Sequence, residues 1–387
     1  MNFRWLSLKK WTTVKLLSST VVWILLILAV VDVFLVRVRP LQYVTDLRFI
    51  PLAQHPMVSK IPVFLESRDR TNLFVLGSSQ PMCAIAEYDE KCYGEPHCKV
   101  GFELSRYMGA RYLEEQLSQK ARHRVKVANM SIVACMASDM FIILSHSILA
   151  GKKPDSVLVC VASRDFVDNH VQPIGLTPPF EVLQDWKSLN EVLRPSLKPS
   201  ERRALIISSF WYFYRVKIDY RTVITQYCSK LLRRPSSLYY ASRSALDNSQ
   251  PKQSSKNSSK FAGSDAVFER IYRPPNFQRF AVEMEFFQKL LSLFSSAKSR
   301  CTVVNMPVSL PYQAFLDARL RHSYMAGTKR LCAVYGAKYL DFNDREFSNQ
   351  DFSDGFHLNA FGAEKFQKRL ILNMVKRGEL GAEGAGC

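Results

Sequence analysis

The sequence lacks the patterns that most often mark a bound metal. It has nine cysteines but no Cys-x-x-Cys pair, and its histidines outside segment 354–357 show no ligand spacing. Cys83, Cys92 and Cys98 lie close together and leave a disulfide or a shared metal open. Most of the other cysteines have the surroundings of small buried apolar residues. We therefore expect no metal site, and nothing in the sequence indicates a cofactor.

Acidic residues are scarce in this chain. There are 34 Asp and Glu against 53 Lys and Arg, which gives a formal net charge of +19. Such a surplus attracts anionic polymers or lipid headgroups. The basic residues are spread out and form no recognisable nucleic-acid-binding motif, so no nucleic-acid partner is expected. With 47% hydrophobic residues in 387, the chain has enough apolar side chains for a large core, which excludes a disordered basic protein.

One long apolar run lies near the N-terminus. Residues 16–36 carry a single charge, Asp32, and match the ~20 residues that a helix needs to cross a bilayer. No small-x-small cleavage site follows, which favours a retained anchor over a removed signal peptide. Segment 1–15 has basic but no acidic residues, so the positive-inside rule places it in the cytoplasm. The sequence predicts a single-pass protein of the cell membrane whose C-terminal domain is extracytoplasmic, either periplasmic or on the cell surface.

From residue 72 to 376, predicted strands alternate with predicted helices. Strands that are apolar on both faces and separated by helices indicate a parallel sheet covered by helices. We therefore expect an α/β fold of three layers (α/β/α), with about five strands in the sheet. The expected strands are 72–77, 124–132, 156–162, 301–306 and 338–342, and the expected helices are 102–121, 137–150, 279–298, 313–335 and 360–376.

Other segments differ from this pattern. Residues 37–71 contain four prolines and are interpreted as a juxtamembrane connector, and residues 81–101 as irregular structure. The aromatic-rich stretch 181–234 is expected to be a helical insertion. Residues 235–262 are rich in Ser, Lys, Asn and Gln and are expected to form a flexible linker. A short tail, 377–387, follows the domain.

Two segments at opposite ends of the predicted domain carry candidate catalytic residues. Ser79 follows the first predicted strand, where open α/β sheets place their sites. Asp354 stands three residues before His357, so one loop can present a histidine oriented by a carboxylate. Each feature alone has an ordinary structural explanation, as a turn or as a helix cap. Together they predict a Ser–His–Asp triad in the order Ser79, Asp354, His357.

These segments resemble the SGNH (GDSL-type) hydrolases, in particular the membrane-anchored branch that includes DltD and the alginate O-acetylation proteins. The resemblance covers residues 70–165 and 300–376. It rests on Val75-Leu76-Gly77-Ser78-Ser79, Asn129-Met130-Ser131, Ser163-Arg164-Asp165-Phe166 and Asp354-Gly355-Phe356-His357. It implies a flavodoxin-like sheet, Ser79 as nucleophile and the Asp354–His357 pair as the rest of the triad.

The resemblance also implies an oxyanion hole, and this chain departs from the family pattern at two of its blocks. The second block of the family supplies a glycine N–H, where this chain has Ala134 and Ala137. The third block supplies an asparagine, where this chain reads Ser-Arg-Asp. Four residues are therefore candidates for oxyanion or substrate binding: Asn129, Ser163, Arg164 and Asn169. Arg164 could instead form a structural ion pair with Asp165 at the strand end.

Two functions follow as expectations. The first is a membrane-anchored serine esterase or O-acyltransferase that acts through an acyl-serine on a cell-envelope polysaccharide or another surface acyl ester. For it, the resemblance implies a membrane-bound protein as acyl donor. The second is a catalytically weak binding or assembly subunit for an anionic glycopolymer, suggested by the altered second and third blocks and by the basic surplus.

Overall fold

The computed structural model describes residues 20–38, 56–94, 107–183, 199–213 and 265–375, and the single positions 220, 224 and 228. The predicted N-terminal segment 1–15, linker 235–262 and tail 377–387 lie outside the described residues. The chain divides into two compact units. One comprises Met1–Pro51 with Lys198–Tyr240, and the other comprises Leu52–Leu197 with Ala241–Cys387.

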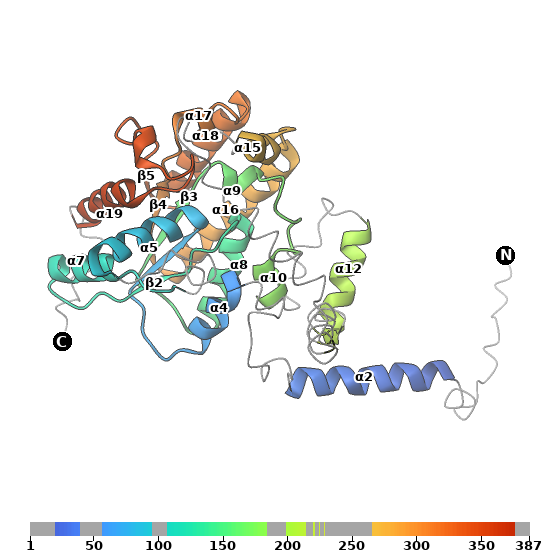
Figure 1. Ribbon diagram of the computed structural model, residues 1–387. Coiled ribbons are helices and arrows are strands. Elements are labelled where there is room, and N and C mark those ends of the chain that lie inside the picture. Colours follow the sequence, from blue (N-terminus) through green and yellow to red (C-terminus); the bar gives the residue numbers. More distant parts are fainter. Residues whose placement is uncertain are drawn as a thin grey trace, which may run out of the picture. The chain divides into compact units, whose positions relative to one another are not determined.

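The second unit contains a parallel sheet of five strands in the order β2-β1-β3-β4-β5 (Figure 1). This confirms the expected α/β fold. The chain passes from β1 outward to β2 and then crosses back to β3, so the strand order reverses between β1 and β3. Ligands of such sheets bind at this switch point, beyond the carboxyl ends of the strands. The strands are β1 (Leu73–Gly77), β2 (Val127–Asn129), β3 (Ser156–Val161), β4 (Arg300–Asn305) and β5 (Lys338–Asp341).

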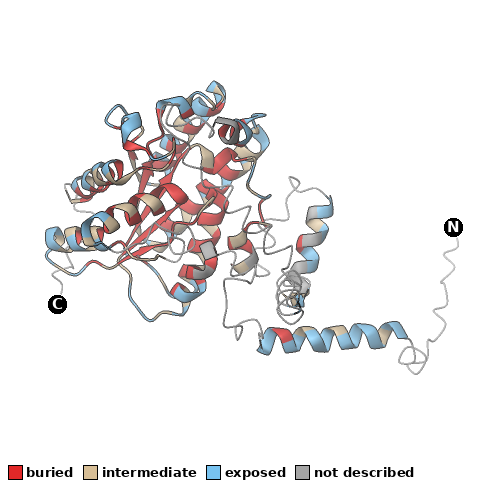
Figure 2. Cartoon of the chain, viewed as in Figure 1, coloured by how far each residue is buried: buried red, intermediate tan, exposed pale blue. Residues whose placement is uncertain are grey.

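The strands β1 and β3 are buried along their whole length (Figure 2). Their apolar side chains alternate between the two faces of the sheet, so burial of every position requires cover on both faces. In β1 and β3, Gly77 pairs with Cys160, which aligns the carboxyl ends of the two strands. The segment that follows β1 therefore starts beside the segment that follows β3.

Two groups of helices pack among themselves. The first comprises α5 (Ser79–Tyr93), α7 (Arg111–Ala121) and α19 (Ala360–Val375), and the second comprises α8 (Ala137–Leu149), α16 (Phe277–Ala297) and α18 (Ala318–Val334). Shorter elements complete the unit: α4 (Pro56–Glu66), α9 (Arg164–Val167), α10 (Pro178–Leu183), α15 (Asp265–Tyr272), α17 (Leu310–Gln313) and the 3₁₀ turn η3 (Asn349–Asp351). Right-handed crossovers would place the two groups on opposite faces of the sheet, so the three-layer arrangement stays a prediction.

The segment after β1 is helical, so the irregular structure predicted for 81–101 is wrong as far as residue 94. Ser78 has extended backbone at the N-cap, and Pro81 lies in the first turn, where a proline costs no hydrogen bond. Gly94 ends α5 with a left-handed φ of 71°. Buried residues recur at helical spacing, including Met82 and Ile85.

Other boundaries also differ from the prediction. The second strand is limited to Val127–Asn129, although 124–132 was expected. The helix expected over 102–121 begins at Arg111 in the described residues. The helix expected over 313–335 is divided into α17 and α18, because Asp317 caps a new start by accepting the N–H groups of Arg319 and Leu320.

The predicted connector 37–71 contains the helix α4. Two of its residues, Lys60 and Ile61, are buried. The Lys60 ammonium donates to the carbonyl of Ser131, and burial lowers the pKa of Lys60 to about 7. The helix is therefore packed into the second unit, which begins before the predicted boundary at residue 72.

The first unit contains α2 (Thr20–Val38) and α12 (Pro199–Phe210). The 19 residues of α2 are long and apolar enough to cross a membrane, as expected for 16–36, and almost all are exposed to solvent (Figure 2). Its one carboxylate has partners: Asp32 accepts the backbone N–H groups of Tyr212 at 3.2 Å and Phe213 at 2.7 Å. This charge is therefore satisfied within the unit by the chain that follows α12.

Candidate active site

Ser79 is the first residue of α5, directly beyond the carboxyl end of β1. Gly77 is required there, because a Cβ at this position would overlap the Pro81 ring and lie 2.8 Å from the carbonyl oxygen of Cys160. The turn therefore passes close to β3 before the helix begins. The first N–H groups of a helix have no partner within the helix, so the Ser79 N–H belongs to a set of donors with partial positive charge.

The turn 354–357 presents its histidine to Ser79. Oδ1 of Asp354 accepts the backbone N–H groups of Phe356 at 3.0 Å and His357 at 2.8 Å. Oδ2 lies 2.6 Å from Nδ1 of His357, and Nε2 of His357 lies 2.8 Å from Oγ of Ser79. The structure thus joins three residues that are up to 278 positions apart in one hydrogen-bonded chain. If Nδ1 carries the proton, Nε2 is free to accept the proton of the serine.

The charge of Asp354 is stabilised in this turn. Burial alone would raise the pKa of its carboxyl, but the charge and hydrogen bonds of His357 and the N–H of Phe356 outweigh burial. Together they lower the pKa of Asp354 to about 2. The carboxylate therefore remains ionised at neutral pH and favours the orientation of His357 that faces the serine.

Gln80 holds the two halves of the site together. Its Nε2 donates to the carbonyl oxygens of Pro307 and Phe356, at 3.2 Å each, and its side chain is buried. It thereby connects the start of α5 both to the segment after β4 and to the histidine turn. Sequence reasoning missed Gln80, and its place beside Ser79 was the only signal.

Gly355 fixes the other side of the turn. A Cβ on Gly355 would overlap the ring of Tyr312, and the Gly355 carbonyl accepts the N–H of Ser309 at 3.1 Å. The Tyr312 ring also packs against Phe356, with centroids 5.3 Å apart. The turn is therefore held against the segment after β4 by backbone and aromatic contacts.

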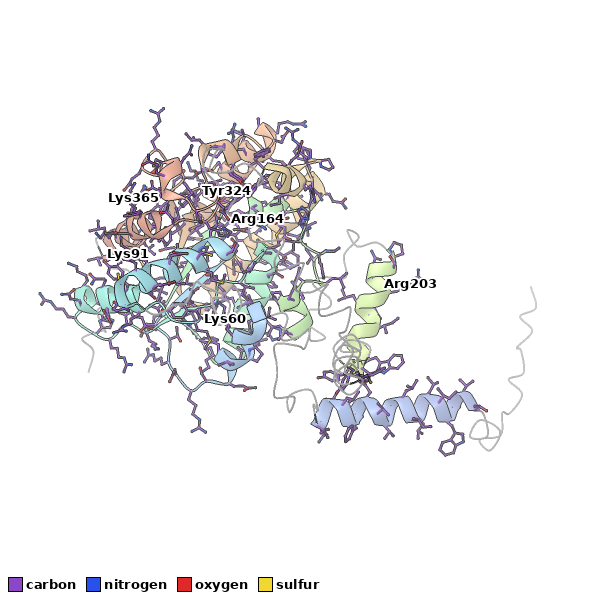
Figure 3. The ribbon with its side chains drawn as sticks, in the orientation of Figure 1. Lys60, Lys91, Arg164, Arg203, Tyr324 and Lys365 are labelled. Carbon is purple, nitrogen blue, oxygen red and sulfur yellow. The ribbon has the colours of Figure 1, made fainter. Side chains whose placement is uncertain are left out.

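Arg164 lies at the amino end of α9, on the segment after β3 (Figure 3). Its Nε donates to Oδ2 of Asp168 at 2.7 Å, and its guanidinium lies 5.6 Å from the centre of the Phe356 ring. The expected alternative of an ion pair with Asp165 is therefore wrong in its partner. The guanidinium of Arg164 contacts the Phe356 ring of the histidine turn, and it forms an ion pair with Asp168.

The Asp165 carboxyl contacts Ala162, directly after β3, and the side chain of Ser78, the residue before Ser79. It accepts the N–H of Ala162 at 2.8 Å. Burial raises the pKa of Asp165 to about 7, and hydrogen bonds from Ala162 and Ser78 oppose this rise only in part. The contact with Ser78 connects this carboxyl to the turn that carries Ser79.

The other predicted binding residues have different surroundings. Asn129 is buried at the end of β2, where Oδ1 accepts the Ser131 N–H at 3.2 Å and Nδ2 has no partner among the described residues. Ser163 lines a cavity at the edge of the sheet. The Asn169 amide donates to the Pro274 carbonyl at 3.0 Å and accepts from Asn276 at 3.2 Å, so it serves a loop connection. The oxyanion role of Asn129 stays a prediction.

Ala134 is one of the two alanines that stand near the second block. It adopts a left-handed φ of 56°, which costs an alanine more than a glycine. The backbone at Ala134, in the loop after β2, therefore has a conformation that a glycine adopts more easily. Ala137, the other alanine noted there, is the first residue of α8.

The cysteines that were considered for pairing are free thiols where the structure describes them. Cys83 is half-buried and Cys92 is exposed, and Cys98 lies outside the described residues. Within the described ranges, no group of three or more His, Cys, Asp or Glu could hold a metal ion.

No family model matches the chain, and no curated protein matches it either. The geometry around Ser79 and the resemblance of the short blocks are therefore what supports a functional assignment.

Proposed function

We propose that the chain is a membrane-anchored serine esterase or O-acyltransferase of the SGNH type, which works through an acyl-serine intermediate. The observation that carries this proposal is the continuous hydrogen-bonded chain from Asp354 through His357 to Ser79, with separations of 2.6 and 2.8 Å. A serine bonded to a histidine that a carboxylate orients is the arrangement that activates a serine nucleophile.

In the first half of the reaction, Oγ of Ser79 attacks the carbonyl carbon of an ester, and Nε2 of His357 takes the hydroxyl proton. In this proposal the N–H of Ser79, at the start of α5, donates to the oxyanion, with Asn129 or Ser163 as further donors. The tetrahedral intermediate then collapses. The C–O bond to the leaving alcohol breaks, and His357 returns the proton to that alcohol.

In the second half, His357 takes a proton from water or from an acceptor hydroxyl, whose oxygen attacks the acyl carbon. The bond to Oγ breaks, and Ser79 recovers its proton. Water as acceptor gives an esterase, and a sugar or polyol hydroxyl gives an O-acyltransferase. By resemblance to the anchored relatives, the proposed substrate is a cell-envelope polysaccharide or another surface acyl ester, with a membrane-bound protein as acyl donor.

The proposal includes the placement of the chain in the cell. The helix α2 is the membrane anchor, and the basic residues before it favour a cytoplasmic N-terminus. The α/β domain, built as three layers, is then extracytoplasmic. The surplus of positive charge would draw an anionic polymer toward this domain.

The test is covalent labelling of the full-length chain in detergent. We expect a fluorophosphonate probe to modify Ser79, as located by mass spectrometry, and expect Ser79→Ala and His357→Ala to abolish the labelling. Ser78→Ala is the matched control, because it removes the neighbouring hydroxyl of the same Gly-Ser-Ser turn and should still be labelled. Absence of labelling in the folded chain would overturn the assignment and would favour the anionic-glycopolymer binding subunit.

A further inference from the structure

The depth of Asp32 in α2 decides where its partners lie. The 19 residues of α2 correspond to a length of ~28 Å, close to the ~30 Å thickness of the hydrocarbon core of a bilayer. Asp32 lies six residues before the end of α2 at Val38, which is ~9 Å along the helix axis. If α2 spans a membrane, this carboxylate is therefore inside the hydrocarbon core, where a charge without partners is costly.

The partners of Asp32 are backbone N–H groups that themselves need an acceptor. Helical backbone resumes at Tyr212 after a break at Trp211. The first N–H groups of a helix have no partner within the helix, and they favour a negative charge nearby. Asp32 accepts the N–H groups of Tyr212 at 3.2 Å and Phe213 at 2.7 Å, so the carboxylate and the helix start satisfy each other. Because they are in contact, Tyr212 and Phe213 lie at the same depth as Asp32.

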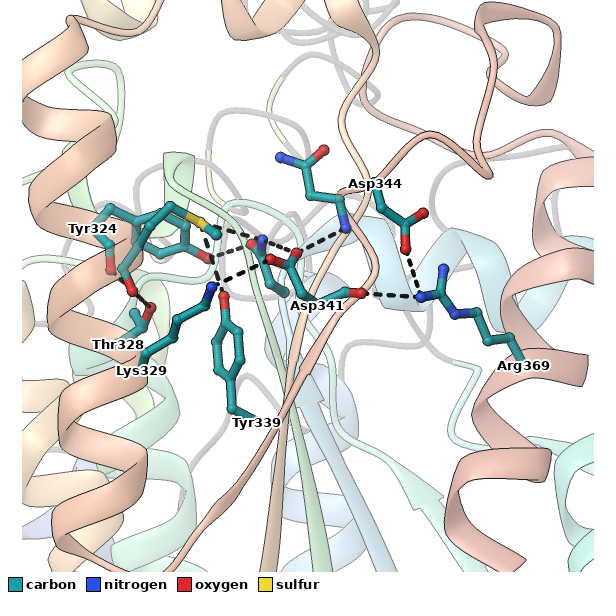
Figure 4. Close-up of polar contacts among 10 residues, drawn as sticks. Tyr324, Thr328, Lys329, Tyr339, Asp341, Asp344 and Arg369 are labelled. Carbon is teal, nitrogen blue, oxygen red and sulfur yellow. Dashed lines mark hydrogen bonds and ion pairs between the residues drawn. The ribbon is translucent and has the colours of Figure 1, made fainter. Parts of the chain in front are cut away.

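Carboxylates of the second unit have partners of another kind. Asp341 forms an ion pair with Lys329 at 3.9 Å (Figure 4). In the same view, Asp344 pairs with Arg369 at 2.6 Å. Among the described residues no cationic side chain pairs with Asp32, whose partners are main-chain groups 180 positions away and more. In lipid every backbone N–H must find an acceptor, and Asp32 meets that need for two of them.

Apolar side chains are exposed beyond α2 as well. Ile206 and Ile207 of α12 and Phe213 after it are exposed. They belong to the same compact unit as α2, whose apolar side chains are exposed along nearly its whole length (Figure 2). A contiguous exposed apolar surface marks contact with a partner or with a membrane. Because α2 is long and apolar enough to span a bilayer, lipid is the occupant that covers both helices of this unit.

The helix α12 is too short to cross a bilayer. Its 12 residues correspond to ~18 Å, a length typical of core helices and of interfacial or re-entrant segments. Arg203 is exposed near its amino end (Figure 3) and lies nine residues before Tyr212, which is ~14 Å along a helix. With Tyr212 at the depth of Asp32, a basic side chain at this distance reaches the headgroup phosphates. Trp211 and Tyr212 are of the residue types that membrane proteins place at the interface.

We propose that residues 199–213 form a second membrane attachment, which lies against lipid in the same leaflet as the carboxyl end of α2. Asp32 holds Tyr212 and Phe213 below the headgroups. The exposed apolar side chains of α12 contact acyl chains, and its amino end stays among the headgroups. This part of the expected helical insertion then serves the membrane and not the hydrolase domain. The inference rests on α2 as the membrane anchor of the proposed function, but not on the triad.

The experiment uses the full-length wild-type chain in phosphatidylcholine vesicles that contain a lipid with a photoreactive diazirine on its acyl chain. After illumination, mass spectrometry locates the lipid adducts. We expect adducts in α2 and in the tryptic peptide 204–215. Adducts in α2 alone would overturn this inference and keep the anchor, whereas the absence of adducts in α2 would overturn the anchor on which the inference rests. Fluorophosphonate labelling of Ser79 tests the catalytic proposal separately.

Asp32→Leu tests the contact that sets the depth of the segment. It removes the acceptor of both N–H groups, so labelling of peptide 204–215 should fall severalfold while labelling of α2 stays unchanged. Asp32→Asn keeps a side-chain oxygen that can accept, and it should restore most of the labelling. Val33→Leu is the matched control, because Val33 is the next residue, is exposed and carries no acceptor. Equal labelling of the peptide in Asp32→Leu and the wild type would overturn the role of Asp32 in holding the segment.

Discussion

Two short segments lie beside Ser79: the first turn, 354–357, and the second turn, 163–168, which is the single helical turn α9 with its two caps. Each places a carboxylate near a cationic side chain. In the turn 354–357, Asp354 pairs with His357, and His357 is also bonded to the serine. In the segment after β3, Arg164 pairs with Asp168 and contacts the first turn only through an aromatic ring. Similar sequence spacing therefore gives a hydrogen-bonded chain to the serine in one turn and an ion pair in the other.

The carboxyls of the two turns also differ in their protonation. The pKa of Asp354 is lowered to about 2 by its partners, whereas burial raises the pKa of Asp165 to about 7. The difference shows that a short-range partner decides the charge of a carboxyl when it is strong enough to outweigh burial. Substitutions in the two turns should accordingly have effects of different kinds.

The largest effect is expected from the histidines. His357→Ala should lower kcat on an ester substrate by about 10⁶-fold, because it removes the general base. His170→Ala is the control: it removes an exposed histidine that follows the second turn and should leave kcat nearly unchanged. Steady-state kinetics of both variants would check this, and equal losses would contradict the contrast between the turns.

The next effect concerns Asp354. Asp354→Asn should lower kcat by about 10⁴-fold, since an amide no longer favours the tautomer with the proton on Nδ1. Asp165→Asn should cost less than about tenfold, because Asp165 contacts the backbone and Ser78 but no triad member. A comparable loss in both variants would show that the second turn also takes part in the chemistry.

Arg164→Met tests the ion pair of the second turn. Asp168 is buried, so the loss of its partner should lower the free energy of unfolding by about 3 kcal/mol. The exposed pair of Arg273 and Glu269 is the comparison, and Arg273→Met should cost under about 1 kcal/mol. Thermal unfolding in detergent measures both losses in the free energy of unfolding. Equal losses would mean that burial does not set the contribution of these ion pairs to stability.

The pH dependence of stability should separate the two carboxyls. Asp354 has a folded pKa below the unfolded value of ~3.9, so its stabilisation is present above about pH 4 and is lost as pH falls toward 2. Asp165 has a raised folded pKa, so its contribution is present below about pH 4 and is lost as pH rises through 7.

Melting temperatures measured from pH 2 to 8 check these signs. Asp354→Asn should flatten the acid side of the profile, and Asp165→Asn should flatten the fall between pH 4 and 7. The Asn side-chain oxygen can still accept the N–H of Ala162, so the second variant keeps that contact. A profile of Asp165→Asn that matches the wild type would contradict the raised pKa.

The smallest effect is expected at Asn169, which the resemblance offered as an oxyanion donor. Its amide is used in contacts with Pro274 and Asn276. Asn169→Ala should therefore reduce stability by about 1–2 kcal/mol through two lost hydrogen bonds and change kcat less than about threefold. A large loss of kcat with unchanged stability would restore the catalytic interpretation.

Much of the fold was readable from local pattern. The short apolar runs at residues 73–77 and 156–161 predicted strands whose side chains are buried on both faces of a parallel sheet, and every residue of β1 and β3 is buried. The helix α5 was missed, because its sequence mixes apolar residues with Cys, Tyr, Asp and Glu and follows a Gly-Ser-Ser turn. What makes it a helix is its packing against α19 and the glycine end at Gly94.

The sequence by itself determined the parallel α/β sheet, the apolar N-terminal helix and the chemical identity of Ser79, Asp354 and His357. These features depend on the residue types and on the spacing of apolar residues along short segments, and that spacing decides between helix and strand. Only the tertiary structure decided that His357 lies 2.8 Å from Ser79, which is 278 positions away. It also decided that Arg164 pairs with Asp168 and that Gln80 connects the segment after β4 to the histidine turn. Such pairings depend on which loops the strand order brings together, and no short segment of sequence specifies that.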